Sequence, residues 1–380
     1  MCKKSSNFGR RLLYLFYVSH CSSEWGLVGF NTRSAIRGTP SPARMYVRAN
    51  VRNNRALVAK NRQILYLIAH KYKYLTKFDK KICLFHFFVV YLQPNWISMT
   101  IAIFGNAMKG STLNEVSHLL EFMQLRGVDV VLSQELRQEL NLRDYKPFKE
   151  ADEPIDFALS VGGDGTFLTT AAEIGRSNIP ILGINCGRLG FLADVQTKNV
   201  DMIMDQLIRG RYTIEQRTLL HVETSRNDLI MAPYALNEVA VMKYGLSSMI
   251  TIETRVNNEL LHKYEADGLL FATPTGSTAY NLSIGGPLMV PQARGIILSP
   301  IATHSLNVRP LVVPDDWEMD LIVKSRTGSY LISVDGRSQV MSHDITLHIK
   351  KADYTIKLVQ IGENSFLQSL KDKLLWGQAN

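Results

Sequence analysis

The feature that most constrains the fold of this chain is a glycine-rich turn, Gly162 to Thr166 (GGDGT), between two regular segments. The apolar run Ile155–Val161 before it is typical of a buried strand, and Phe167–Gly175 after it favours the first turns of a helix. Glycines let the backbone approach an anion closely, and a helix N-terminus attracts negative charge. The segment therefore predicts a phosphate site between a strand and a helix.

The aspartate inside this turn, Asp164, is the residue that suggests a reaction. A carboxylate should repel phosphate unless it binds a metal ion or takes a proton from an attacking hydroxyl. The alternative is an ordinary strand–helix turn with Asp164 as a capping residue. We interpret the turn as a site of phosphoryl transfer, because other motifs of the chain accompany it.

The basic character of the chain is confined to its first 98 residues. This segment holds 17 Lys and Arg against two acids, Glu24 and Asp79, whereas residues 99–380 hold 26 Lys and Arg against 32 acids. The body therefore carries a net charge of −6, and its composition does not indicate nucleic-acid binding.

Cysteine usage and hydropathy indicate a cytoplasmic protein without a membrane partner. Of the four cysteines, only Cys186 lies after residue 98, so the body cannot form a disulfide framework. The longest apolar run, Ile82–Leu92, is shorter than the roughly 18–20 residues that span a bilayer.

Residues 1–98 have no sustained period and allow three interpretations. They could be a targeting arm, a disordered tail that binds polyanions, or upstream sequence translated from an early start codon. We favour the third, because Met99 immediately precedes a clean strand pattern. We accordingly expect a chain that begins at Met99 to fold and to be active.

From Met99 the pattern predicts a Rossmann-like α/β domain over residues 99–217. Strands are predicted at Thr100–Phe104, Val128–Ser133, Ile155–Val161 and Pro180–Asn185. Helices are predicted at Leu113–Gly127, after the glycine turn, and at Val200–Gly210. Alternating strands and helices indicate a parallel sheet covered by helices.

Residues 218–362 predict an all-β, sandwich-like domain. Short alternating strands follow one another here, among them Leu260–Tyr264 and Leu269–Thr273, and Asn257-Asn258 fits a hairpin turn. Residues 363–380 form a tail in which Phe366, Leu370 and Leu374 share one helical stripe. We expect this helix to return to the first domain.

Three further segments could carry chemistry. After the strand that ends at Thr273, a run of glycine and hydroxyl residues leads to Tyr280, and such a turn suits an adenine or a ribose. Asn237-Glu238 places an amide and a carboxylate in a strand, where burial is costly unless they bind something. A third glycine turn, Gly187 to Gly190, follows the strand that ends at Asn185.

Together these motifs resemble the NAD kinase family. The resemblance rests on GGDGT, Asn237-Glu238, DGLLFATPTGSTAYNLSIGGPLMVP (from Asp267) and SPIATHSLNVRPLVV (Ser299–Val313), and it runs from about Met99 to the C-terminus. GGDGT alone also occurs in lipid kinases and phosphofructokinases. The segment around Thr278-Ala279-Tyr280 is much more specific.

The resemblance implies transfer of the γ-phosphoryl group of ATP to the 2′-hydroxyl of the adenosine ribose of NAD. It implies that Asp164 is the catalytic base, that Gly165 lines the same pocket, and that Asn237 and Glu238 hold the NAD ribose. The remaining nucleotide-binding residues would be Asp267 (within one subunit or across an interface), Thr278, Ala279, Tyr280, Asn281, Leu282 and Ser283, with Thr278, Ala279, Tyr280 and Ser283 around the adenine. We also place Arg337, after Ser333-Val-Asp335-Gly336, in a loop near the ligand.

The resemblance further implies a divalent metal ion such as Mg²⁺ and a homodimer or homotetramer. The single cysteine of the body and its scattered histidines show no metal-ligand spacing, so we predict no metal-binding side chains. Glu265 departs from the family pattern at a position near the nicotinamide, which leaves the choice between NAD and NADH open. Two rival functions stay open at this point: a lipid or sugar kinase that shares the GGDGT turn, and a silent dinucleotide-binding regulator.

Overall fold

The computed structural model describes residues 99–151, 153–187, 190–193, 195–196, 200–245, 248–362 and 366–375. The expectations for residues 1–98 lie outside these described residues. The description below concerns the unit Trp96–Asn380, which contains all the described residues.

The first half of this unit contains a parallel sheet with the strand order β3-β2-β1-β4-β5-β6, in which every neighbouring pair is parallel. The strands are β1 (Thr100–Gly105), β2 (Asp129–Leu132), β3 (Lys146–Pro147), β4 (Phe157–Gly162), β5 (Ile181–Asn185) and β6 (Val195–Gln196). The predicted Rossmann-like arrangement is confirmed.

Helices cover both faces of this sheet. On one face, α5 (Gly110–Arg126), α6 (Gln134–Glu139) and α8 (Val200–Ile208) share a core cluster with residues of β1, β4 and β5. On the other face, α7 (Asp164–Ile174) packs through Phe167, Ala171 and Ile174. Two short 3-10 turns complete this half, η2 (Phe148–Glu150) and η3 (Gly175–Ser177).

The order of the strands fixes where a ligand can bind. From β1 the chain passes through α5 to β2 on one side, and β4 then pairs with β1 on the other side. In open parallel sheets, ligands bind beyond the carboxyl ends of the strands at such a reversal. The turn Gly162–Thr166 leaves the carboxyl end of β4 at this point.

The second half is a β-sandwich, as predicted. One layer runs β16-β15-β9-β11-β12-β13, and the other runs β10-β14-β17-β7-β8. The first half of β11 also pairs with β10, so the two layers are continuous at this edge. The layers enclose a large apolar core. The strands are β7 (Thr213–Thr224), β8 (Tyr234–Ala235), β9 (Glu238–Lys243), β10 (Ile250–Val256), β11 (Glu259–Ala272), β12 (Ile296–Thr303), β13 (Leu311–Val313), β14 (Met319–Lys324), β15 (Ser329–Val334), β16 (Arg337–Ser342) and β17 (Thr346–Gln360).

The two strands predicted at Leu260–Tyr264 and Leu269–Thr273 are wrong, because β11 is one continuous strand of 14 residues. Between them, Ala266 points inward while Glu265 and Asp267 are more exposed, so the alternation of a strand simply continues. The predicted hairpin turn is confirmed: Asn257 and Asn258 have φ angles of 49° and 68° between β10 and β11.

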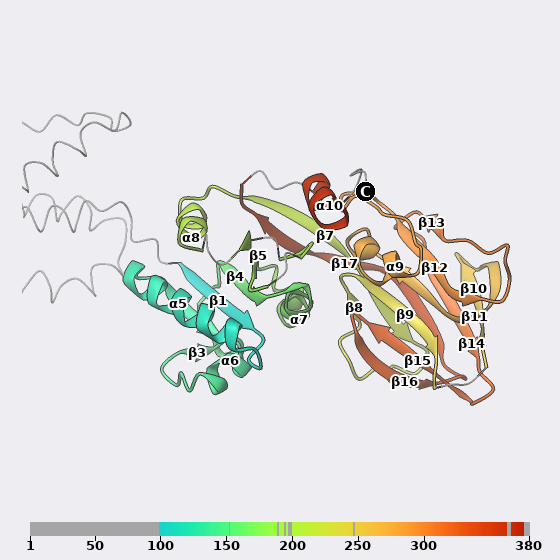
Figure 1. Cartoon of the computed structure of the whole chain (residues 1–380). Helices are drawn as coiled ribbons and strands as arrows, with labels where there is room; N and C mark the ends of the chain where they lie inside the picture. Colours follow the sequence, from blue (N-terminus) through green and yellow to red (C-terminus); the bar gives the residue numbers. More distant parts are fainter. Residues whose placement is uncertain are drawn as a thin grey trace, which may run out of the picture. The chain divides into compact units, whose positions relative to one another are not determined.

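Two long strands join the halves (Figure 1). β17 pairs with β7 along most of its length, and its Leu358 also lies beside Ile181 of β5. After β17, helix α10 (Phe366–Leu374) returns to the first half, where the ring of Phe366 lies 6.3 Å from that of Phe191. The predicted return of the C-terminal helix is confirmed.

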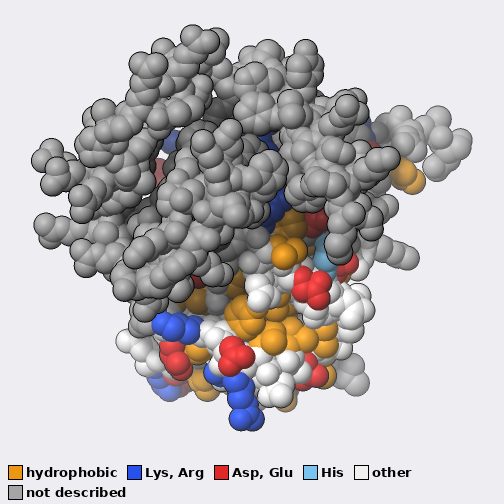
Figure 2. Space-filling model, turned by 90° about the vertical axis from the view of Figure 1, so that its left-hand side faces the viewer, with side chains coloured by type: hydrophobic (Ala, Val, Ile, Leu, Met, Phe, Trp, Pro, Cys, Tyr) orange, Lys and Arg blue, Asp and Glu red, His pale blue; other side chains and the backbone are white. Residues whose placement is uncertain are grey.

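The visible surface of the described part mixes side chains of different kinds. Figure 2 shows a group of hydrophobic side chains bordered by acidic and basic ones on the face that it presents. No helix in the described part of the chain combines the length and the apolar character needed to cross a membrane.

The packing of α5 gives a first prediction. Leu119 of this helix is fully buried, whereas Leu125, on the same helix, is 87% exposed. Leu119→Ala should lower the free energy of unfolding by about 2–5 kcal/mol, because it leaves a cavity in the core. Leu125→Ala, the matched control, should change it by less than about 0.5 kcal/mol. Urea unfolding of both variants tests this, and equal midpoints would contradict the packing described.

Candidate active site

The glycine turn presents free main-chain N–H groups. Gly163 is the N-cap of α7, and no side chain caps this helix. The first N–H groups of a helix have no partner within the helix, so they are available to an anion. A Cβ added to Gly163 or Gly165 would meet no heavy atom within 4 Å, so the backbone of the turn is accessible from outside. The geometry fits the predicted phosphate site.

Asp164, the first residue of α7, holds the neighbouring turn. Its carboxylate accepts hydrogen bonds from the main-chain N–H groups of Phe191 (2.8 Å), Leu192 (3.0 Å) and Ala193 (3.0 Å). Gly190 makes this approach possible, because a Cβ there would overlap the carboxylate. The turns after β4 and β5 are thus brought together at the carboxyl edge of the sheet.

Asn237 and Glu238 lie where β8 passes into β9. The main-chain N–H groups of Leu236 (2.7 Å), Asn237 (2.8 Å) and Glu238 (3.1 Å) all donate to the carboxylate of Asp335. Leu236 also belongs to the core cluster that contains Phe167 of α7 and Leu192. This shared cluster connects the Asn237-Glu238 segment with both glycine turns.

Glu238 is half-buried, and one oxygen of its carboxyl group makes no hydrogen bond to the described residues. Its Oε2 atom is buried and has no hydrogen-bond partner among the described residues. Burial, and then the charge of Asp335, raise the pKa of Glu238 to about 7, although a hydrogen bond from the main-chain N–H of Tyr280 acts in the opposite direction. A buried oxygen without a partner is costly, so this group is suited to accept a hydrogen bond from a ligand.

The turn after β11 packs directly on Asn237. It consists of η5 (Thr275–Thr278) and α9 (Tyr280–Ser283). Gly276 has no room for a Cβ, because that atom would overlap the main-chain carbonyl of Asn237. The hydroxyl of Thr273 donates to the carbonyl of Leu236 (2.5 Å). The main-chain N–H of Tyr280 donates to Glu238, so Tyr280 lies beside this carboxyl group. Because Tyr280 is 38% exposed, its side chain is accessible to a ligand.

In the turn formed by η5 and α9, the predicted binding residues differ in their exposure to solvent. Thr278, Ala279 and Leu282 are half-buried and Ser283 is exposed, but Asn281 is fully buried. The Asn281 side chain donates to the carbonyls of Ser277 (3.3 Å) and Pro287 (3.0 Å) and accepts from the Ser299 hydroxyl (2.6 Å). Its side chain holds the turn in shape instead of facing a ligand.

Asp267 and Arg337 are not brought to this cluster. Asp267 pairs with Lys243 at 2.8 Å, and the register of β9 and β11 places it five residues along the ladder from the Glu238–Ala272 pair, about 16 Å away. Arg337 donates to the main-chain carbonyls of Tyr234 (2.8 Å) and Val334 (3.1 Å), so it braces β8.

Asp335 is the residue that sequence reasoning missed. In the sequence, Asp335-Gly336 is a typical two-residue hairpin turn, and the structure has φ angles of 47° and 79° there, between β15 and β16. Nothing in that local pattern indicates that the side chain reaches back to residues 236–238.

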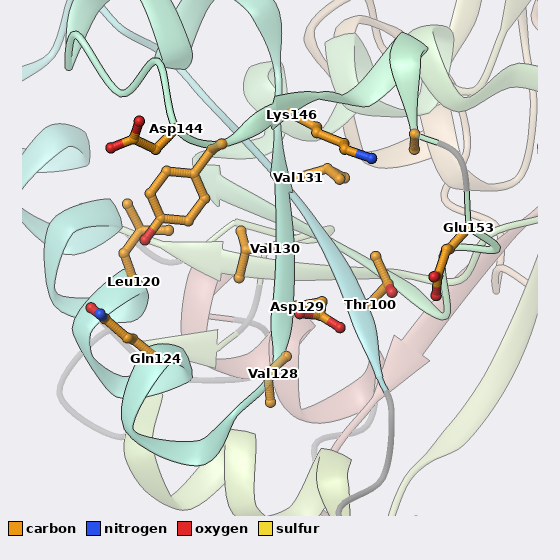
Figure 3. A pocket seen from close by; sticks show the side chains of 12 residues that line it. Thr100, Leu120, Gln124, Val128, Asp129, Val130, Val131, Asp144, Lys146 and Glu153 are labelled. Carbon is orange, nitrogen blue, oxygen red and sulfur yellow. The ribbon is translucent and has the colours of Figure 1, made fainter. Parts of the chain in front are cut away.

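Two cavities lie in the described part of the chain. One, of about 450 Å³, is lined by Thr100 and Asp129, which begin β1 and β2, and thus lies at the edge opposite the glycine turn (Figure 3). Charged side chains of Asp144, Lys146 and Glu153 surround it. The other, of about 380 Å³, is lined by α7 and by Tyr234, Leu236 and Asp335, so it adjoins the segment that leads to Glu238.

The described residues do not form a protein-held metal site. No group of three or more His, Cys, Asp or Glu side chains lies together among them. Asp164 already accepts three main-chain hydrogen bonds, all from residues 191–193. The donor set therefore does not fit a metal ion bound by the protein alone.

Comparisons with known proteins agree with this geometry. The family model of the ATP-NAD kinase N-terminal domain matches residues 101–212, and that of the C-terminal domain matches residues 236–361. The NAD kinase of Bacteroides fragilis is 42% identical over 285 residues, covering 73% of this chain and 98% of that protein. The NAD kinase of Flavobacterium johnsoniae is 42% identical over 290 residues, covering 74% and 99%.

Crystal structures of two kinases share the fold. A yeast NADH kinase complexed with NADH superposes with a TM-score of 0.66 at 24% identity, over 74% of this chain and 89% of that one. An NAD kinase from Archaeoglobus fulgidus in complex with ATP gives a TM-score of 0.55 at 27% identity, over 68% and 93%. With two family models that together match more than half of its length, this chain belongs to the ATP-NAD kinase family.

Proposed function

We propose that this protein is an NAD kinase that transfers the γ-phosphoryl group of ATP to the 2′-hydroxyl of the adenosine ribose of NAD. The hydroxyl oxygen forms a bond to the γ-phosphorus, the bond to ADP breaks, and the hydroxyl proton is taken up by a carboxylate. The observation that carries the proposal is Glu238, whose buried Oε2 has no partner within the described residues and which lies beside Tyr280.

Glu238 and Asn237 would hold the ribose of NAD. A carboxylate accepts hydrogen bonds from vicinal hydroxyls, and charge-assisted bonds of this kind are stronger than neutral ones. The open ring of Tyr280 offers a face on which adenine can stack, and the half-buried Thr278 and Ala279 would line the same pocket. Ser283 is exposed at the end of this turn.

Asp164 would be the base, at the glycine turn that receives the phosphates. An ionised carboxylate has about four lone-pair sites, and three N–H groups occupy three of them. One site remains for the ribose hydroxyl. Since phosphoryl transfer depends mainly on positioning and on charge stabilisation, Asp164 would contribute about 10²–10⁴-fold.

We propose that a divalent ion such as Mg²⁺ arrives with ATP as part of the substrate, since the described residues offer no cluster of ligands for it. We also propose a homo-oligomer. Asp267, roughly 16 Å along the ladder from Glu238, could then contact the nucleotide of a neighbouring copy. A cytoplasmic location fits the free thiol of Cys186.

The direct test is NADP formation by the full chain with ATP, NAD and Mg²⁺. Turnover with NAD supports the proposal. Tight NADP binding without turnover would support a dinucleotide-binding regulator instead, and turnover only with lipid or sugar acceptors would support another kinase with a GGDGT turn.

Asp164→Asn should lower kcat by at least about 100-fold, because an amide cannot take the proton. The same change also replaces one carboxylate oxygen, which accepts from main-chain N–H groups, with an NH₂ group, which can only donate. The KM for both substrates and the urea midpoint must therefore be measured together with kcat. A loss confined to kcat indicates a base, whereas losses confined to stability and KM would contradict that role.

Asp156→Asn is the matched control for this substitution. The Asp156 carboxylate also accepts a main-chain hydrogen bond, from Thr100 at 2.8 Å, but at the beginning of β1. It lies at the edge of the sheet opposite the glycine turn, so this variant should retain kcat within about threefold of the unmodified protein. A comparable loss of kcat in both variants would remove the specific role of Asp164.

Glu238→Gln should raise the KM for NAD by roughly tenfold or more, because the charged acceptor for the ribose is lost. The KM for ATP should change much less. In the unmodified protein, the KM for NAD should rise as the pH falls through about 7, since Glu238 is then protonated. Initial rates between pH 6 and 8.5 check both statements, and a KM for NAD that Glu238→Gln leaves unchanged would contradict the assignment.

A further inference from the structure

We propose that Asp335 is a positioning residue for the nucleotide: it holds the main chain of the Asn237-Glu238 segment in its binding shape and makes NAD binding depend on pH. This inference rests on the proposed function of the site. Asp335 itself would not touch the reacting atoms, since it acts through Glu238.

Asp335 makes hydrogen bonds to residues 236–238 through both carboxylate oxygens and through its main-chain N–H, an arrangement that we call the clamp. Oδ2 accepts from Leu236 N at 2.7 Å, while Oδ1 accepts from Asn237 N at 2.8 Å and Glu238 N at 3.1 Å. The main-chain N–H of Asp335 donates back to the carbonyl of Glu238 at 3.1 Å. Four hydrogen bonds thus join one hairpin turn to the segment that presents Glu238.

The backbone around Asp335 allows this reach. Asp335 and Gly336 form the turn between β15 and β16, and Val334 of β15 lies opposite Val239 of β9. The side chain at position 335 therefore meets the end of β9 where the ladder stops. Three consecutive N–H groups that would otherwise lack strand partners are satisfied by one carboxylate.

The clamp also places two half-buried carboxyl groups next to each other. Glu238 is affected by the charge of Asp335 and by a hydrogen bond from the main-chain N–H of Tyr280, while Asp335 is affected by its three main-chain donors and by the charge of Arg337. Arg337 is occupied with two main-chain carbonyls. Burial and like charge raise the pKa of Glu238, and burial raises that of Asp335 against its three main-chain donors.

This arrangement couples nucleotide binding to the protonation of Glu238. Ribose hydroxyls favour the ionised form of Glu238, because they donate to it. NAD binding near pH 6.5 should therefore release a proton from Glu238. Removing the charge of Asp335 should let Glu238 ionise at lower pH, so the proton release and the acid limb of the KM for NAD should both shift.

The experiment compares the full chain with Asp335→Asn and with the control Asp344→Asn. Asp344 is an exposed aspartate paired with Arg226 in the same half of the molecule. In the unmodified protein and the control, the KM for NAD should rise roughly tenfold between pH 8 and pH 6. In Asp335→Asn, the KM at pH 8 should be raised severalfold, but its rise between pH 8 and pH 6 should fall to about threefold or less, with kcat changed by less than about threefold.

Two outcomes would overturn the proposal. One is a KM for NAD in Asp335→Asn that equals that of the unmodified protein at every pH. The other is a KM raised by the same factor at every pH, which would indicate a merely structural role. If Asp335→Asn does not fold, calorimetry measures the number of protons released when NAD binds to the unmodified chain, in buffers of different ionisation enthalpy. Absence of proton release near pH 6.5 then contradicts the proposal.

Failure of the proposed function gives a different result. An unmodified chain that makes no NADP at any pH contradicts the kinase assignment. Calorimetric proton release on NAD binding would still test the coupling between Asp335 and Glu238 in that case.

Discussion

Carboxylates that bind consecutive main-chain N–H groups hold the proposed site together. Asp164 fixes residues 191–193 after β5, and Asp335 fixes residues 236–238 before β9. Neither segment belongs to a regular ladder along its whole length, so its N–H groups need other acceptors. The same two carboxylates therefore determine the shape of the backbone and the electrostatic environment of the groups that would meet a nucleotide.

The sandwich and the parallel sheet are joined by strands rather than by a flexible linker. β17 extends from the sandwich to β5, and β7 pairs with β17 along this stretch. The buried Arg217 of β7 pairs with Glu215 at 2.6 Å. Arg217 also donates to the hydroxyl of Thr275 at 3.4 Å. The turn that carries Tyr280 is thus tied to a strand shared by both halves, which suits a site that needs residues from each.

Much of this architecture follows from local sequence patterns. The apolar strand, the glycine turn and the amphipathic helices are encoded within about 10 residues each, so the order of strands and helices could be predicted. Helix α6 was missed, because its six residues include only one buried side chain, Leu136. The predicted break in β11 was wrong, because polar residues on the outer face of a strand resemble a loop.

The predicted site residues come from motifs whose members are neighbours in sequence, whereas the contact of Asp335 with residues 236–238, which the fold brings together, was not predicted. The main-chain N–H of Glu238 donates to the carboxylate of Asp335, nearly 100 residues further along the chain. An Asp-Gly hairpin turn gives no sign of this contact in the sequence. Arg337 was placed near the ligand because it follows that turn, yet it braces Tyr234 and Val334. Asn281 lies inside the nucleotide-binding motif, but its polar atoms are all engaged within the turn.

The arrangement of donors and acceptors explains how a site in an acidic body can receive an anionic substrate. The body of the chain has a net charge of −6, and the proposed site contains three carboxylates, Asp164, Glu238 and Asp335. Two of them are turned toward main-chain N–H groups, which leaves the uncapped N-terminus of α7 to face phosphate. Glu238 keeps a buried oxygen without a partner and Asp164 keeps one lone-pair site, and at both positions a hydroxyl and not a phosphate would bind. Phosphate and hydroxyl recognition are thereby separated within one site, as transfer between a nucleotide donor and a hydroxyl acceptor requires.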